Sequence, residues 1–234
     1  MNTRSQLLAA WCGPAFMAVL LIGFALVAGL FPPHSPAFGA DQVAAWYRAD
    51  PVRIRLGLLI FMWGTALYLP FAGTLTVRLR HIEGPFPVWT YVQLAASACN
   101  VLTLTFPMAF WAAAAFRPDR DPALIQLLDD LGWIPFVSMT SPFLLIPICI
   151  AIVGFGDKSE HPVFPRWACY YNLLADSLLM PGGLIIFFKT GPFAWNGLFG
   201  IWIPLTDWGI WFGITTYLLV KAIKREEQAC LQAG

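Results

Sequence analysis

The chain is poor in charged residues. Only 12% of its 234 residues are charged, and fourteen Lys and Arg against thirteen Asp and Glu leave a formal net charge of +1. Ordinary soluble domains carry about 25% charged residues. The balanced charge gives no electrostatic reason to expect a nucleic acid as a partner. The apolar content of 59% excludes a disordered chain and argues against a water-soluble globule.

Histidine is absent from the apolar runs, and cysteine is not arranged in pairs that could bind a metal or form a redox site. The three histidines, His34, His81 and His161, all lie in loops between apolar runs. A b-type haem held between membrane helices needs two facing histidines, so that class is excluded. The five cysteines are scattered and form no C-x-x-C pair. No phosphate-binding glycine-rich loop occurs, which excludes ATP-driven transport by this chain alone. We therefore expect neither a cofactor nor a metal site.

Long apolar runs are what the sequence has in abundance. Each is long enough to cross a bilayer, which takes about 20 residues. Backbone groups in lipid must be paired within the protein, and the runs show no polar alternation, so they predict helices rather than barrel strands. We predict an all-α integral membrane protein with one domain over residues 1–234, a bundle of six transmembrane helices. The predicted spans are about 7–31, 54–77, 88–116, 133–155, 167–188 and 197–220.

The loops carry most of the charge and two further helix signals. Asp121-Pro122 is a good cap and first-residue pair, and the leucines after it have amphipathic spacing. This pattern predicts a short interfacial helix over 121–132, between the third and fourth spans. Residues 41–48 predict another short helix on the membrane surface. Eight basic residues in the loops of one side against six on the other favour both termini in the cytoplasm.

Two aspartates lie inside spans. Asp176 is the tenth residue of the fifth span and Asp207 the eleventh of the sixth. At about 1.5 Å per residue, both lie near the middle of the hydrocarbon layer. The two spans are consecutive, so we expect antiparallel neighbours with the acids at the same depth. No basic residue lies there to pair with them, so we expect a shared proton or one neutral acid beside one anion. We predict that Asp176 and Asp207 are catalytic.

Polar, aromatic and helix-breaking residues surround the two acids in the sequence. Pro181-Gly182-Gly183 follows Asp176 and Pro204 precedes Asp207, which predicts broken helices beside the carboxylates. Tryptophans near the midplane are not explained as interface anchors, and they suit a pocket for a lipophilic ligand. The predicted substrate-binding residues are Asn100, Asn172, Trp202, Trp208, Trp211 and Tyr68.

Three functions fit these residues. The first is a membrane-embedded enzyme of cyclase or isomerase type that acts on an isoprenoid-, sterol- or quinone-like molecule by acid–base catalysis. The second is a proton-linked carrier or channel for a small solute, which with six spans implies a homo-oligomer. The third is an accessory subunit of a membrane complex. The expected partners are the lipid bilayer and a small lipophilic molecule. An enclosed aromatic cavity would favour the enzyme, and a water path would favour the carrier.

Overall fold

The computed structural model describes residues 3–232, and every regular element in that range is helical. Several of the helices change type along their length, from α to the wider π or the tighter 3₁₀ form. The elements, in chain order, are α1 (Thr3–Leu20), the π-helix η1 (Leu21–Val27), α2 (Ala40–Ala49), α3 (Pro51–Gly64), the 3₁₀ turn η2 (Thr65–Leu67), α4 (Tyr68–Glu83), α5 (Val88–Phe116), α6 (Pro122–Ser138), α7 (Ser141–Gly156), α8 (Arg166–Leu179), the 3₁₀ helix η3 (Met180–Phe187), the π-helix η4 (Leu198–Trp202) and α9 (Ile203–Gln232).

Within residues 3–232, five helical stretches are long and apolar enough to cross a membrane, which supports a multi-pass helical membrane protein. The predicted span 88–116 coincides with α5 at both ends. The predicted span 197–220 lies in η4 and α9 and is not among these five. The five stretches are Thr3–Val27, Pro51–Glu83, Val88–Phe116, Pro122–Gly156 and Arg166–Phe187.

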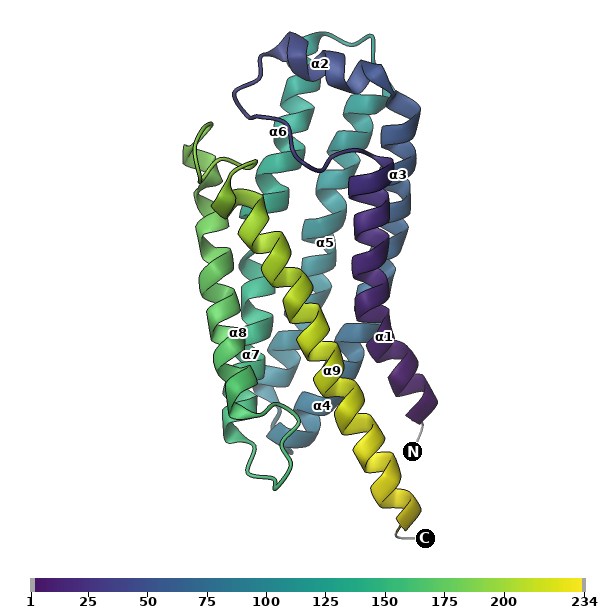
Figure 1. Ribbon diagram of the computed structural model, residues 1–234, viewed down its shortest axis with the longest axis vertical. Helices are drawn as coiled ribbons and strands as arrows, with labels where there is room; N and C mark the ends of the chain where they lie inside the picture. Colours follow the sequence, from purple (N-terminus) through teal and green to yellow (C-terminus); the bar gives the residue numbers. More distant parts are fainter. Residues whose placement is uncertain (1–2, 233–234) are drawn as a thin grey trace.

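The segment predicted as a separate interfacial helix belongs to a longer one. Asp121 caps α6 and Pro122 begins it, as the sequence indicated. No break follows at residue 132, and the helix runs on to Ser138 alongside α5 (Figure 1). The break comes at residues 139–140, and Pro142 then stands in the first turn of α7, where proline is tolerated.

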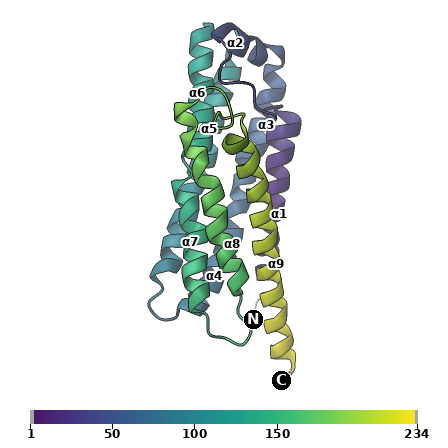
Figure 2. The ribbon, with the colours of Figure 1, turned by 60° about the vertical axis from the view of Figure 1, so that its left-hand side comes forward.

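The long helices lie side by side, and one short helix covers an end of the bundle. Figure 1 and Figure 2 show α2 lying across that end, at a large angle to the others. Residues 40–49 are helical, which confirms the short helix predicted over 41–48. The described ends of α1 and α9 both lie at the opposite end of the bundle. There, buried Arg78 of α4 donates hydrogen bonds to Glu226 of α9 and Gln6 of α1, which ties the three helices together.

Close backbone contact positions η1 against α3. A Cβ atom added at Gly57 would lie 2.3 Å from the backbone nitrogen of Ala28 and 2.4 Å from the carbonyl oxygen of Gly23. No side chain fits in that space, so glycine is required at the crossing. The contact fixes the π-helical end of the first membrane stretch, which includes Phe24.

Candidate functional site

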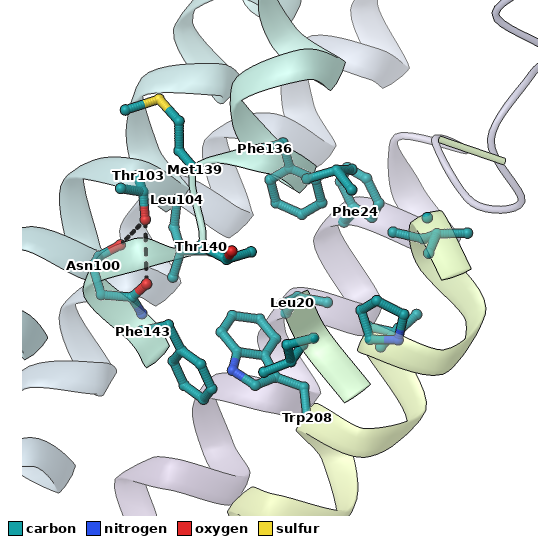
Figure 3. A pocket seen from close by; sticks show the side chains of 16 residues that line it. Leu20, Phe24, Asn100, Thr103, Leu104, Phe136, Met139, Thr140, Phe143 and Trp208 are labelled. Carbon is teal, nitrogen blue, oxygen red and sulfur yellow. Dashed lines mark hydrogen bonds between the residues drawn. The ribbon is translucent and has the colours of Figure 1, made fainter. Parts of the chain in front are cut away.

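A pocket of about 730 Å³, counting the open space at its mouth, lies among the helices (Figure 3). Its walls come from α1, η1, α5, α6, α7, α8, η4 and α9 and are mostly apolar. The aromatic part of the wall is Phe24, Phe136, Phe143 and Trp208. The polar part is Asn100, Thr103 and Thr140. A mostly apolar cavity with a few polar groups is the usual form of a small-molecule site.

The irregular parts of the helices meet at this pocket. It is lined by residues where α1 passes into η1, where α6 breaks before α7, where α8 passes into η3, and within η4. Such departures from α-helical geometry often mark functional sites, and within a membrane they are tolerated where they line a cavity. At Pro181-Gly182-Gly183, where a broken helix is predicted, the helix instead changes type: α8 ends at Leu179 and the 3₁₀ helix η3 continues it to Phe187. The residues concerned are Leu20, Phe24, Met139, Thr140, Leu179, Gly200 and Ile201.

Asn100 presents an unpaired hydrogen-bond donor at the pocket. The residue is only 3% exposed. The Thr103 hydroxyl donates to its backbone oxygen at 2.9 Å and to its Oδ1 at 3.2 Å. The Asn100 Nδ2 group has no partner among the described residues. Figure 3 shows the Asn100 side chain on one side of the pocket, between Thr103 and Phe143.

The two acids predicted to lie within spans are buried on neighbouring helices. Asp176 of α8 is 6% exposed and Asp207 of α9 is 5% exposed. The Tyr171 hydroxyl donates a hydrogen bond to Asp207 Oδ1 at 3.0 Å. Asp207 Oδ2 and both carboxyl oxygens of Asp176 have no partner within residues 3–232. The two groups are close enough for the charge of Asp207 to act on Asp176.

The acids flank the pocket rather than open into it. Neither Asp176 nor Asp207 is among its lining residues. Leu179, three residues after Asp176, and Pro204, three residues before Asp207, do line it. Residues three apart on a helix share a face, so both acids neighbour the pocket wall.

The other predicted binding residues have separate places. Trp211 donates from Nε1 to Asn172 Oδ1 at 2.9 Å, and Asn172 Nδ2 donates to the Ala168 carbonyl at 2.8 Å, so this pair joins α9 to α8 outside the pocket. Tyr68 is buried, with its hydroxyl facing Ser97 and Asn100.

Trp202 is 44% exposed and packs on Phe31, with ring centroids 4.9 Å apart, also outside the pocket. Of the six predicted binding residues, the structure therefore brings Asn100 and Trp208 to the pocket wall.

Sequence reasoning missed a third buried acid beneath α2. Asp129 of α6 is 1% exposed. Its Oδ1 accepts a hydrogen bond from the Tyr47 hydroxyl at 2.7 Å, and its Oδ2 lies 2.8 Å from His34 Nε2. We call His34, Tyr47 and Asp129 the cap cluster. A signal was available, since Asp129 is four residues from both Ile125 and Trp133 and so lies on the apolar face of its helix.

The cap cluster is buried, and both carboxyl oxygens of Asp129 have hydrogen-bond partners. Burial, and then the neighbouring Asp129 charge, raise the pKa of Tyr47 well above its usual value near 10, so the hydroxyl keeps its proton. The Trp195 Nε1 group donates to the His34 carbonyl at 2.8 Å, and its ring stacks on Trp133 with centroids 6.0 Å apart. These contacts join α2, α6 and the loop before η4.

The described part of the chain contains no group of three or more His, Cys, Asp or Glu side chains arranged to hold a metal ion. Comparison with known proteins adds no relative, because no family model, curated protein or solved structure matches the chain.

Proposed function

We propose that the protein is a membrane-embedded enzyme that binds a lipophilic molecule in the pocket and converts it by acid–base catalysis. The observation that carries this proposal is the convergence of the helix irregularities on one mostly apolar pocket. Its aromatic walls suit an isoprenoid-, sterol- or quinone-like molecule. The alternative of an accessory subunit gives no reason for such a cavity.

Asp176 and Asp207 supply the chemistry in this proposal. Their unpaired oxygens, with no basic side chain among their hydrogen-bond partners, support a neutral acid that can donate a proton. A proton passes from one carboxyl group to the substrate, and a carboxylate takes a proton back from another substrate atom. The product then has the same mass as the substrate, as in an isomerisation or a cyclisation. Since Leu179 and Trp208 belong to the intervening wall, we propose that one of them moves aside for the transfer.

The proposal includes a sixth crossing by η4 and α9. These elements run back along the bundle to the end where α1 begins (Figure 2). Both termini then lie on one side of the membrane. We propose that this side is the cytoplasm, in line with the excess of basic residues in its loops. The element we place along the membrane surface is α2.

The test compares lipid products with and without the acids. Nanodiscs containing the purified protein are incubated with a total lipid extract, which is then analysed by untargeted chromatography and mass spectrometry. We expect the wild type to produce a compound of unchanged mass and altered retention, and the Asp176→Asn/Asp207→Asn double variant to produce none. Ser177→Ala is the matched control, because that hydroxyl is exposed on α8 and bonds only to the Leu173 carbonyl. Identical lipid profiles for the wild type and the double variant would contradict the proposal.

One observation favours the proton-linked carrier as the second candidate. The acids and the pocket are adjacent but separate, as a proton site and a solute site are in such carriers. The carrier form predicts acidification of proteoliposomes, followed with an enclosed pH-sensitive dye, when a lipophilic solute is added. That signal would disappear in the double variant with no change in lipid mass or retention. A carrier of this size would act as a homo-oligomer.

A further inference from the structure

The pocket presents a hydrogen-bond donor that has no partner, so a ligand that carries an acceptor would suit it. Among residues 3–232, Asn100 Nδ2 is buried and has no hydrogen-bond partner, although the Tyr68 hydroxyl faces this amide group, while Asn100 Oδ1 already accepts from the Thr103 hydroxyl. The Thr103 proton is used within α5 in the same way. A buried donor without a partner is unfavourable, because it has lost its hydrogen bonds to water. A bound oxygen atom would remove that cost.

The N-terminus of α7 faces the same space. Thr140 precedes this 16-residue helix and lines the pocket, as does Phe143 in its first turn. No side chain caps the helix, and Leu144 is the residue whose N–H bonds back to the Thr140 carbonyl. The first N–H groups of a helix lack partners within it and carry partial positive charge. This end of the pocket therefore attracts electron-rich oxygen, in agreement with the unpaired Asn100 amide.

The oxygen must belong to an uncharged group. No Lys, Arg or His lines the pocket, so an ionised carboxylate or phosphate would be buried there without a counter-charge. A hydroxyl group could accept the same hydrogen bond, but its own proton would then need an acceptor such as the Thr140 hydroxyl oxygen. A carbonyl oxygen brings two acceptor sites and no donor.

We infer that the pocket binds a lipophilic ketone or quinone, with the carbonyl oxygen between Asn100 Nδ2 and the N-terminus of α7 and the hydrocarbon part against the aromatic wall. This inference rests on the proposed function, because it names the substrate class of the same pocket. It also assigns Asn100 as the residue that distinguishes a carbonyl compound from its alcohol.

The test uses matched pairs of probes that differ only at the oxygen. The pairs are geranylacetone with its alcohol and cholestenone with its allylic alcohol, and their dissociation constants are measured by equilibrium dialysis against protein in nanodiscs. We expect the ketone to bind about tenfold more tightly, the worth of one hydrogen bond. Asn100→Leu, which removes the donor at similar volume, should reduce the preference to less than about twofold. Thr105→Val is the control on the same helix, because its hydroxyl bonds to Val101 and lies outside the pocket lining.

A second measurement, made on the wild type, tests the inference even if Asn100→Leu does not fold. The carbonyl stretching band of a labelled ketone bound to the wild type should shift to lower frequency than in hydrocarbon solvent, as hydrogen bonding requires. Equal binding of ketone and alcohol, an unshifted band, or a preference retained by a folded Asn100→Leu would each overturn the inference and leave the pocket as a lipophilic site. Failure of all four probes to bind would instead overturn the proposed function.

Discussion

Within residues 3–232 three acids are buried at two places, beneath α2 and beside the pocket, and the two places differ in how the carboxyl oxygens are hydrogen-bonded. Asp129 in the cap cluster has both carboxyl oxygens engaged, by the Tyr47 hydroxyl and the His34 ring. Asp176 has neither oxygen engaged, and Asp207 has one. All three residues are buried, with 1% to 6% of their surface exposed. Burial alone therefore does not distinguish the acid of the cap cluster from the two acids beside the pocket, whereas the hydrogen-bond partners do.

The difference fits the roles that we propose for these acids. A carboxylate that holds elements together needs partners on those elements, and Asp129 has them on α2 and on the loop after η1. A carboxyl group that exchanges a proton with a substrate needs a free oxygen. The following three predictions test this contrast, from the largest expected effect to the smallest.

The acids beside the pocket should matter for activity and little for stability. Asp176→Asn or Asp207→Asn is expected to reduce product formation by about 10²- to 10⁴-fold, the usual contribution of a general acid or base. The free energy of unfolding should change by less than about 1 kcal/mol, because asparagine has nearly the same shape. Product yield by mass spectrometry and unfolding in mixed micelles give the two values. Full activity in either variant would show that its carboxyl group is not catalytic.

Leucine substitutions should separate the two kinds of acid by stability. Asp129→Leu leaves the Tyr47 hydroxyl and His34 Nε2 without their partner, and we expect a loss of about 3 kcal/mol in the free energy of unfolding. Asp176→Leu removes a group that no described residue satisfies, so stability should stay constant or rise. Both are measured by denaturant unfolding of protein in mixed micelles. Equal losses of unfolding free energy in Asp129→Leu and Asp176→Leu would show that the two acids do not differ in how they contribute to stability.

Removing one hydroxyl from the cap cluster should have the smallest effect. Tyr47→Phe is expected to cost about 1 kcal/mol at neutral pH. Because the folded protein raises the pKa of Tyr47, its hydroxyl stabilises the fold below pH 10 and loses that contribution as the pH rises through the folded value. Above pH 10 the wild type should lose up to about 1.4 kcal/mol more per pH unit than Tyr47→Phe.

The measurement is the free energy of unfolding of both proteins at a series of pH values. Parallel curves for the wild type and Tyr47→Phe would mean that Tyr47 is not held neutral by the cluster.

The sequence predicts the helices of this protein better than its contacts. Apolar length determines where a helix can cross a membrane, and α5 is found where the sequence places it. Which side chains meet depends on how each helix rotates and tilts against its neighbours, and packing decides that. Asn100 and Trp208 therefore reach the pocket while Trp202 turns outward, and no residue count separates these cases.

The continuity of α6 shows the same limit. A good cap and amphipathic leucines describe a helix start equally well whether the helix ends after three turns or continues. Only the contacts of Asp129 and Trp133 with distant segments show that α6 is buried at that point.

The bond between Trp195 and His34 joins residues 161 positions apart in the chain. During synthesis His34 leaves the ribosome long before Trp195 does, so this bond cannot form until the loop before η4 has been made. The covering of α2 over its end of the bundle is thus completed late in assembly, after most of the membrane helices have been inserted. A nascent chain that ends before residue 195 lacks the hydrogen bond between Trp195 and His34. Its first loop then remains accessible to chaperones and proteases at the end of the bundle that α2 covers.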